Sequence, residues 1–447
     1  MELKNKKVLV MGLGIHSGGE GVVRYLVEKG ANVTVTDLKT KSQLNPTLKK
    51  LARLPIKYIL GQHRTKDFKN SDFIIRNPDV PLNSPFLAIA RQNNIPVLME
   101  INLFWEECPS RKIIGVTGTK GKTTTASLLQ KALSSANIAT VIGGNLGVSL
   151  LEILSQINSD TWVVLELSSW QLEGLKNQQS SPHISIITNI FPDHLNRYQT
   201  MADYVAAKKL VFAYQKKGDY LILNRQNSWT KQLKKEAPGK VILFSEKDVP
   251  ESWKSNIKLP GKHNLANIAA VLGVAKILQL NPSSIKKAIA NFSGLSHRLE
   301  PVRSISKIEF YNDSAATNPT ASKMAIQSFT QPIIWILGGT DKNLKFDKLI
   351  KTAQKQKNLK ALILLAGTAT EKIKIEIKKY LPKATTLGPF DKLLPAIHQA
   401  FRLAKAGDIV LLSPGAASFG MFKNEFDRGN QFKKIVNDLA QEKPTFK

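Results

Sequence analysis

The 447-residue chain has a single cysteine and no apolar stretch close to the ~20 residues that a membrane-spanning helix needs. One thiol, Cys108, excludes an internal disulfide, and a small apolar role suits it better than that of a nucleophile. The first residues are basic and then apolar, but a glycine-rich turn follows them and an A-x-A cleavage site does not. We therefore expect a soluble, cytoplasmic protein without membrane insertion.

Acidic residues are also scarce, with 34 Asp and Glu against 64 Lys and Arg, so that the formal net charge is +30. Such a charge can attract nucleic acids, anionic membranes or polyanionic substrates. Many of the lysines are dispersed along helix-like segments such as KTAQKQKNLK, without a compact cluster of arginine and aromatic residues. Dispersed lysines usually form a solvated surface, so the charge alone does not establish nucleic-acid binding.

A glycine-rich segment with the sequence GVTGTKGKTTT occupies residues 115–125, between an apolar run and a helix-like stretch. This is the context of a phosphate-binding loop, because small residues let backbone N–H groups close on an anion at a helix N-terminus. The strict G-x-x-x-x-G-K-[ST] pattern is not met, since Val116 stands in place of its first glycine. We nevertheless predict an ATP or GTP site, with Lys122 on the outer phosphates and Thr123 on a magnesium ion. The other predicted contacts of this loop are Gly118, Thr119, Lys120, Gly121 and Thr124.

The length of the chain predicts two to four domains. Short apolar runs alternate with helical stretches throughout, which indicates parallel sheets covered by helices. We predict an α/β fold of three domains: a Rossmann-like domain at 1–107, an ATP-binding domain at 108–296 and a second Rossmann-like domain at 297–447. Internal repeats and low-complexity linkers are absent from the sequence.

The first predicted domain opens with a strand and a turn that contains Gly12 and Gly14. Asp37 ends the second strand, where such folds commonly hold a ribose or a similar polar group. The G-x-G-x-x-G fingerprint fails because Ser17 precedes Gly18. A diphosphate ligand without nicotinamide therefore fits as well as a dinucleotide.

Five residues of the middle domain are candidates for chemistry. Glu166 ends an apolar strand, where a carboxylate can bind Mg²⁺ beside phosphates or simply face water. His194 in FPDHLNRY and Lys208 in DYVAAKKLVF carry weaker signals, since a loop histidine and a solvated helix lysine explain them equally well or better. Asn264 and Asn267 lie three apart on one helical face, suited to an adenine edge or a ribose, with a helix cap as the alternative for Asn264.

The last domain contains three clusters of turn residues: NDSAATNP at 312–319, GGTDK at 338–342 and SPGAASFGMFKN at 413–424. Each cluster alone is ordinary turn chemistry. Together they offer potential binders of a carboxylate, which are Thr317, Lys342 and Ser418.

The order of these motifs resembles that of the Mur ligase family over essentially the whole chain. The segments that carry the resemblance are the GLG turn, TGTKGKTTT, GGNLG, ELSSWQLE, NIFPDHLNRY, YVAAKK, LPGKHNLAN, GLSHRLEPV, NDSAATN, GGTDK and SPGAASF. The resemblance implies a uridine-nucleotide-binding domain, an ATPase domain and an amino-acid-binding domain. It is strongest to the members that add glutamate to UDP-N-acetylmuramoyl-L-alanine with ATP and Mg²⁺, through an acyl phosphate, in peptidoglycan-precursor synthesis.

The resemblance also implies roles for individual residues. His194 is similar to a ligand of a second metal, and Lys208 matches a position that the family carbamylates to make an anionic metal ligand. Contacts to the acceptor are implied for Gly14, Asp37, Asn145 and Ser168, a contact to ATP for Arg298, and a contact to the incoming amino acid for Phe419. A monomer whose third domain swings to close the site is expected.

Four segments depart from the family pattern. Ala315 stands where the glutamate-adding members usually have a lysine, and the aromatic residue usual after FKN is displaced, which leaves Glu425 and Phe426 in KNEFDRG. RNPDVP replaces a small-residue loop, which changes what Asn77 can contact, and His16 lengthens the first turn. The choice between D- and L-glutamate therefore stays open at this point.

Several other functions remain as alternatives. One is a related ligase that uses another amino acid, or a folate or polyamino-acid acceptor, although the first domain argues against the folate branch. A basic ATPase stimulated by nucleic acid is a second, and it would bind DNA or RNA in a salt-sensitive way. A dehydrogenase would require nicotinamide binding, for which the phosphate loop leaves little room.

Overall fold

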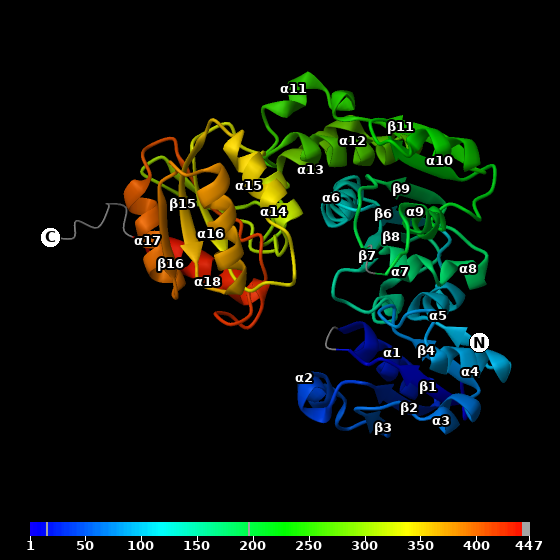
Figure 1. Ribbon diagram of the computed structural model, residues 1–447. Helices are drawn as coiled ribbons and strands as arrows, with labels where there is room; N and C mark the ends of the chain where they lie inside the picture. The colour runs from blue at the N-terminus through cyan, green and yellow to red at the C-terminus, as the bar shows by residue number, and fades with distance from the viewer. Residues whose placement is uncertain (15–16, 195–196, 440–447) are drawn as a thin grey trace. The chain divides into compact units, whose positions relative to one another are not determined.

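The computed structural model describes residues 1–14, 17–194 and 197–439. The chain forms two compact units, one of Met1–Ser255 with His263–Ile289 and one of Asn256–Lys262 with Ala290–Lys447. The first unit contains two sheets and the second contains one, as Figure 1 shows. The division predicted at residues 107/108 and 296/297 stays a prediction. No helix in the described ranges is both long and apolar enough to cross a membrane.

The first sheet has the strand order β3-β2-β1-β4-β5, and all of its pairings are parallel. Its strands are β1 (Lys7–Met11), β2 (Asn32–Asp37), β3 (Lys57–Leu60), β4 (Phe73–Arg76) and β5 (Val97–Leu98). Its helices are α1 (Ser17–Glu28), α2 (Lys41–Leu51), α3 (Thr65–Lys69), α4 (Pro85–Gln92) and α5 (Glu100–Glu107).

The order of the strands places a topological switch point between β1 and β4. Met11 pairs with Arg76 there, so the turns that follow at Gly12 and Asn77 lie side by side. A Cβ atom on Gly12 would come within 3.0 Å of the Asn77 Cβ atom. In open α/β sheets such a point is where ligands bind.

The second sheet has the order β11-β10-β9-β6-β8-β7 and is also entirely parallel. Its strands are β6 (Ile113–Thr117), β7 (Thr140–Gly144), β8 (Trp162–Glu166), β9 (Ile184–Ile187), β10 (Tyr220–Asn224) and β11 (Lys240–Phe244). Its helical segments are α6 (Lys122–Ser135), η1 (Leu154–Gln156), α7 (Ser169–Leu172), α8 (Leu175–Gln178), α9 (Met201–Lys209), α10 (Thr230–Glu236), η2 (Glu246–Asp248), α11 (Glu251–Lys254), α12 (Lys262–Ile277) and α13 (Pro282–Ala290). Because β6 lies between β8 and β9, the segments that follow these strands meet at one edge of the sheet.

One hydrophobic cluster joins the two sheets of the first unit. Buried Ile101 and Phe104 of α5 belong to the same cluster as Leu172 of α7 and Leu175 of α8. A shared apolar core resists separation of its parts, since separation would expose that surface to water. The two sheets therefore form one compact unit.

The sheet of the second unit has the order β12-β13-β17-β14-β15-β16, in which only β12 is antiparallel to its neighbour. The strands are β12 (Glu300–Ile305), β13 (Ile308–Asn312), β14 (Ile333–Gly338), β15 (Leu359–Leu365), β16 (Thr386–Phe390) and β17 (Ile409–Leu412). The helices are α14 (Pro319–Ile326), α15 (Asp347–Gln354), α16 (Thr368–Tyr380), α17 (Leu393–Leu403) and α18 (Glu425–Asp438).

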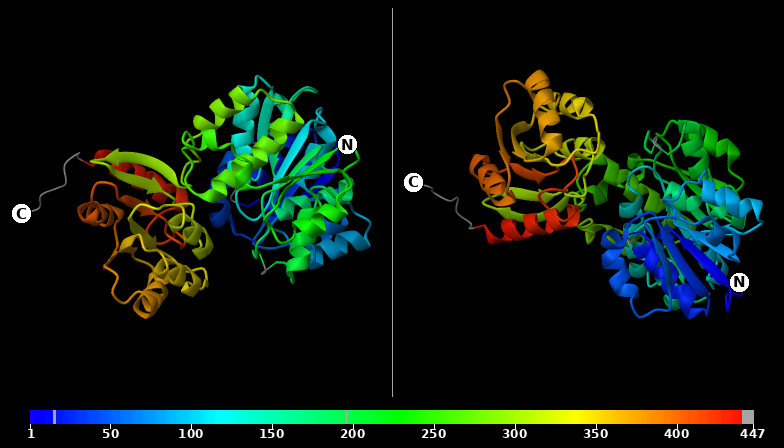
Figure 2. Two further views of the ribbon diagram at one scale, coloured as in Figure 1. Left: turned by 90° about the horizontal axis from the view of Figure 1, so that it is seen from above. Right: turned by 60° about the horizontal axis from the view of Figure 1, so that its bottom comes forward.

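Successive residues of β14 pack on opposite faces of this sheet, as the two-residue period of a strand requires. Trp335 and Leu337 join the cluster with α14, α15 and α16, whereas Ile334 and Ile336 join the cluster with α17 and α18. Figure 2 shows α18, in red, running beside the strands of this sheet. Both faces are thus covered, and the predicted α/β architecture is confirmed.

Candidate functional site

The predicted phosphate loop joins the end of β6 to the start of α6. Gly118 has φ +147° and Gly121 has φ +84°, conformations that favour glycine. A Cβ atom on Gly118 would lie 1.9 Å from Thr188 Oγ1, and one on Gly121 would lie 2.4 Å from Asn267 Oδ1. The glycines therefore let the backbone pass close to its neighbours before it enters α6, and a helix N-terminus after such a loop suits a phosphate.

Residues that follow β9 hold this loop in place. The Asn189 carbonyl and side-chain oxygen accept from the amides of Thr119 and Lys120, both at 2.9 Å, and the Lys120 carbonyl accepts from Asn189 Nδ2 at 2.9 Å. The Lys122 ammonium donates to the carbonyls of Gly118 and Thr119 at 3.0 and 3.1 Å. Sequence reasoning missed Asn189, because a small polar residue after a strand is ordinary turn chemistry until its partner is known.

The first turn of α6 contains Thr123 and Thr124, both half-buried. Asn267 of α12 lies directly against the loop at Gly121 and donates to Asn264 Oδ1 at 3.1 Å. Because α12 begins at Lys262, Asn264 is its third residue and does not occupy the position before the helix. The structure thus places both asparagines beside the phosphate loop, where a nucleotide contact stays a prediction.

Glu166 ends β8 and is 1% exposed. Its Oε1 atom accepts from Asn145 Nδ2 at 3.0 Å, while Oε2 is buried and has no hydrogen-bond partner among the residues that the structure describes. A buried carboxylate oxygen without a donor is costly, and a bound cation would remove that cost. Glu166 therefore fits a metal ion beside the phosphate loop.

Lys208 of α9 is buried rather than solvated, unlike Lys209, which forms an ion pair with Glu236 at 2.7 Å. Its ammonium donates to the Gly118 carbonyl at 3.0 Å and lies 4.6 Å from the centre of the Tyr204 ring. Burial holds the pKa of the Lys208 amine well below its usual value, and the nearby Lys122 lowers it further. The burial of Lys208 could not be predicted from the helical pattern alone, because that pattern does not show which other residues pack against the helix.

His194 follows β9 with φ +54°. Its ring meets the Trp170 ring edge-on at 5.1 Å between centroids and lies 6.1 Å from the Tyr204 ring. Removal of water from the ring lowers the pKa of His194, which Asp193 opposes and the nearby lysines reinforce. A neutral imidazole is the form that binds metals. The described residues contain no cluster of three His, Cys, Asp or Glu side chains, and the predicted metal set includes only two residues of these types.

One cavity of about 440 Å³ brings most of these residues together with the glycine turn of the first sheet. It contains six of the predicted site residues, which are Gly14, Lys122, Asn145, Ser168, His194 and Lys208. Its other lining residues include Gly12, Gly18, Lys39, Arg76, Asn77, Asp79, Glu100, Trp170, Gln171 and Tyr204. A single site therefore extends from the switch point of the first sheet to the phosphate loop of the second.

Two predicted acceptor contacts also shape the walls of this cavity. Asp37 accepts from the amides of Gly14 at 3.1 Å and Lys39 at 2.8 Å, so its carboxylate holds the glycine turn. Ser168 caps α7, where its hydroxyl accepts from the Gln171 amide at 3.2 Å. Their contacts to a ligand stay predictions. His16, expected to lengthen the turn, lies outside the described residues.

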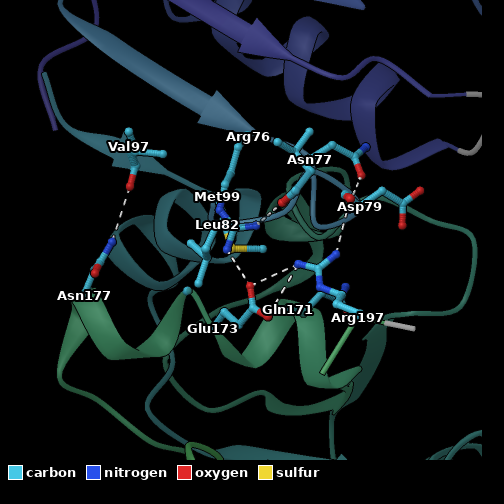
Figure 3. A network of polar contacts seen from close by, with 12 residues as sticks. Arg76, Asn77, Asp79, Leu82, Val97, Met99, Gln171, Glu173, Asn177 and Arg197 are labelled. Carbon is cyan, nitrogen blue, oxygen red and sulfur yellow. Dashed lines mark hydrogen bonds and ion pairs between the residues drawn. The ribbon is translucent and has the colours of Figure 1, made fainter. Parts of the chain in front are cut away.

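Charged residues that the sequence did not single out also reach this cavity. Glu100, the first residue of α5, accepts from the Ser149 hydroxyl and from the Leu150 amide, and burial raises its pKa to about 7. Arg76 ends β4 and pairs with Glu173, as Figure 3 shows. A charged residue at the edge of an apolar run was the available signal in both cases.

The second unit brings its three predicted motifs to one edge of the sheet. The amide of Thr340 donates to the Ala417 carbonyl at 2.9 Å, and that of Gly415 donates to the Ala316 carbonyl at 2.9 Å. The loops after β13, β14 and β17 therefore adjoin, because their strands are neighbours. These loops carry Thr317, Lys342, Ser418 and Phe419.

The predicted residues of this edge differ in exposure. Ser418 is buried, and its hydroxyl has no hydrogen-bond partner among the described residues. Lys342 is exposed, with its ammonium 5.7 Å from the centre of the Phe419 ring. Arg298, predicted to contact ATP, is also exposed and lies in a turn where its amide donates to the Leu295 carbonyl at 3.1 Å.

Comparison with known proteins matches all three parts of the chain to domain families. The Mur ligase MurD-like N-terminal domain matches residues 6–99, the Mur ligase middle domain residues 116–257, and the Mur ligase glutamate ligase domain residues 297–415. Among solved structures, the UDP-N-acetylmuramate-alanine ligase MurC from Thermotoga maritima matches with a TM-score of 0.60 at 18% identity, over 97% of this chain and 99% of that one. A pseudomurein peptide ligase type C from Methanothermus fervidus matches with a TM-score of 0.55 at 20% identity, over 98% of this chain and all of that one. These structures share the fold.

Curated relatives are more similar in sequence. A UDP-N-acetylmuramoylalanine–D-glutamate ligase from Roseiflexus sp. (strain RS-1) is 42% identical over 98% of this chain and all of its own length. A ligase of the same name from Caldanaerobacter subterraneus subsp. tengcongensis is 37% identical over 99% of this chain and all of its own length. With similarity of this extent along the whole chain, and three matching domains in the expected order, the chain belongs to the Mur ligase family.

Proposed function

We propose that the protein is an ATP-dependent ligase that joins D-glutamate to UDP-N-acetylmuramoyl-L-alanine in the cytoplasmic synthesis of peptidoglycan precursor. The observation that carries this proposal is the 42% identity, over 98% of the chain, to a relative named for that reaction. The cavity that joins the glycine turn to the phosphate loop supports it, because the acceptor and ATP must meet at one point. We propose a monomer.

In this reaction the terminal phosphoryl group of ATP moves to the carboxylate of the acceptor, so that its bond to ADP breaks and an acyl phosphate forms. The amine of glutamate then adds to the acyl carbon and loses a proton, and the bond to phosphate breaks to leave the amide. Lys122 donates within the phosphate loop and is suited to offset the negative charge of the transferred group. Backbone N–H groups at the start of α6 would hold the remaining phosphate oxygens.

One Mg²⁺ ion would be held by Thr123 of the first turn of α6 and by Glu166, whose Oε2 atom lacks a partner among the described residues, and His194 would be a ligand of a second metal ion. Bound at these residues, the metal would supply positive charge to offset the negative charge of the phosphates. The buried amine of Lys208 is suited to carbamylation, since a lowered pKa favours the neutral amine that adds to carbon dioxide. That addition forms an N–C bond, releases one proton from the neutral amine and leaves a carbamate, which is an anionic oxygen ligand.

The amino acid would bind at the edge of the second unit where three loops adjoin. Ser418 has a buried hydroxyl that lacks a partner among the described residues, and Lys342 supplies a cation near Phe419. Two carboxylates of glutamate need donors of this kind. Ala315 takes the place of a family lysine, so the charge of Lys342 carries more of the recognition.

The deciding experiment supplies ATP, Mg²⁺ and UDP-N-acetylmuramoyl-L-alanine together with D-glutamate, L-glutamate or another amino acid in separate reactions. Phosphate release and formation of the amide product are expected with D-glutamate only. Absence of product with every amino acid would refute the proposed ligase activity. Formation of product with L-glutamate or another amino acid would refute the proposal that D-glutamate is the specific substrate. Sedimentation of the active protein tests the monomer.

A second experiment tests the role of Lys208. The Lys208→Ala variant should be nearly inactive and should regain part of its activity with short-chain carboxylic acids, which can replace a carbamate. The matched control is Lys209→Ala, whose ammonium instead pairs with Glu236 and which should keep wild-type activity. Full activity of the Lys208 variant would remove this residue from the mechanism.

A further inference from the structure

A cluster of three charged side chains bridges the two sheets of the first unit. Arg76 of β4 donates to Glu173 Oε2 at 2.8 Å, and Arg197, which follows β9, donates to the same oxygen at 3.2 Å. Only 3%, 11% and 12% of the side-chain surfaces of Arg76, Glu173 and Arg197 are exposed. Figure 3 shows the Glu173 carboxylate between the two guanidinium groups.

Both arginines also hold the loop that follows β4. Arg76 donates to the Val80 carbonyl at 2.9 Å, and Arg197 donates to the Asp79 carbonyl at 3.3 Å. Residues 77–79 of this loop line the cavity on the side of the glycine turn. The cluster therefore contacts one wall of the predicted acceptor site through the backbone carbonyls of Asp79 and Val80.

The same cluster reaches the segment that carries His194. The amide of Arg197 donates to the His194 carbonyl at 2.9 Å. The Arg197 guanidinium lies 4.6 Å from the centre of the Trp170 ring, and the edge of that ring meets His194. The Arg197 side chain thus contacts both the Asp79 carbonyl and the Trp170 ring that packs against His194.

Glu173 is the residue on which this arrangement depends. Its carboxylate separates two cations that would otherwise repel each other in a largely buried place, and the Tyr198 hydroxyl also donates to it at 3.4 Å. Burial lowers the pKa of Arg76, and Glu173 opposes that effect. Bidentate and shared guanidinium–carboxylate contacts fix orientation as well as distance.

We propose that Arg76, Glu173 and Arg197 are positioning residues. They fix the position of the loop at residues 77–80 relative to His194, whose carbonyl accepts from the Arg197 amide. The spacing between the acceptor end and the phosphoryl-transfer end of the cavity then depends on Glu173. Displacement of reacting groups by about 1 Å is enough to slow catalysis strongly. The meaning of the two ends rests on the proposed function, whereas the mechanical link between the two segments does not.

The first test measures amide hydrogen exchange in the ligand-free protein for wild type, Glu173→Gln and the control Asn177→Ala. Asn177 donates to the Val97 carbonyl at 3.3 Å and so bridges the same two sheets without contact to either segment. The amides of Val80, Arg197 and Tyr198 are hydrogen-bonded within their segments and serve as reporters. Glu173→Gln should accelerate exchange about tenfold at both segments, and Asn177→Ala should leave it within about twofold of wild type. Acceleration at one segment only, or equally in both variants, would overturn the link.

The second test uses steady-state kinetics of the same proteins. Glu173→Gln should lower kcat/KM for the acceptor about tenfold while the KM for ATP stays within about twofold, a pattern that general loss of structure would not give. Arg197→Lys keeps the positive charge but loses the planar guanidinium, so its kcat/KM for the acceptor should lie between those of wild type and Glu173→Gln. If Glu173→Gln does not fold, Arg197→Lys takes its place in the test. Equal loss for ATP and acceptor would overturn the positioning role. An inactive wild type would refute the proposed function, while the exchange result would still decide the link.

Discussion

Replacement of Lys208 by methionine is expected to stabilise the free protein while it abolishes ligase activity. The Lys208 ammonium is buried, forms no ion pair among the described residues and donates one hydrogen bond, to the Gly118 carbonyl. That carbonyl also accepts from Lys122 at 3.0 Å, so it keeps a partner in the variant. Methionine has a similar length, is apolar and adapts to irregular space.

The expected gain follows from two opposing contributions. Burial of an ammonium without an anion costs several kcal/mol, and a hydrogen bond from a charged donor returns about 1.5–3 kcal/mol. A net gain of about 1–2 kcal/mol for methionine corresponds to a rise in Tm of about 2–4 °C. Activity should fall by at least about a hundredfold, because the proposed metal ligand is lost.

The difference should depend on pH in a defined direction. The folded protein holds the pKa of Lys208 well below the value of about 10.4 that an unfolded lysine has, so the unfolded state binds more protons between these two values. Wild-type stability therefore rises with pH relative to the methionine variant, and the gap in Tm closes as the pH approaches about 10.

Thermal unfolding of both proteins at pH 7 and at about pH 9.5 tests this, in buffer free of carbon dioxide so that the carbamate does not form. A methionine variant that is less stable at pH 7, or a gap that widens with pH, would refute the reasoning. So would retention of ligase activity.

Three further predictions concern other parts of the site. An alanine at Gly121 would be strained in the left-handed conformation that this position requires and would approach Asn267 too closely, so Gly121→Ala should raise the KM for ATP about tenfold; an unchanged KM would contradict this. Ser418→Ala should raise the KM for D-glutamate about tenfold without lowering Tm, since its hydroxyl has no partner among the described residues; equal effects on acceptor and glutamate would count against it. Burial raises the pKa of Asp313 to about 7, so the folded state binds more protons than the unfolded state. As the pH rises from about 5 to about 8, the Tm of wild type should therefore fall relative to that of Asp313→Asn. The reverse trend would exclude the raised pKa of Asp313.

Much of the fold follows from local patterns in the sequence. Short apolar runs that alternate with helical stretches predict parallel sheets, and the structure has three of them. Strands such as β14 are buried on both faces and so read as continuous apolar runs. The glycines of the phosphate loop and its position between β6 and α6 were also readable, because backbone conformation at a glycine depends on near neighbours.

The candidate site was predictable only where a residue is close in sequence to the end of a strand. Glu166 and the clusters of the second unit follow buried strands, and neighbouring parallel strands bring such positions to one edge of a sheet. Lys208 lies within a helix and carried no such signal, and Arg76, although it ends β4, was not singled out from the sequence. The helical pattern around Lys208 indicated a solvated lysine, and the loop after Arg76 was recognised only as a departure from the family pattern.

The sequence by itself thus determined the strands, the phosphate loop and the order of motifs, since these depend on interactions between residues close along the chain. The tertiary structure alone decided that Lys208 is buried against Gly118, 90 residues away, that one oxygen of Glu166 lacks a partner among the described residues, and that Glu173 links Arg76 to Arg197. The physical reason is that the charge state and partners of a buried group depend on what covers it. Strand order and the packing between sheets decide which residues cover such a group, and neither can be predicted from the local sequence pattern.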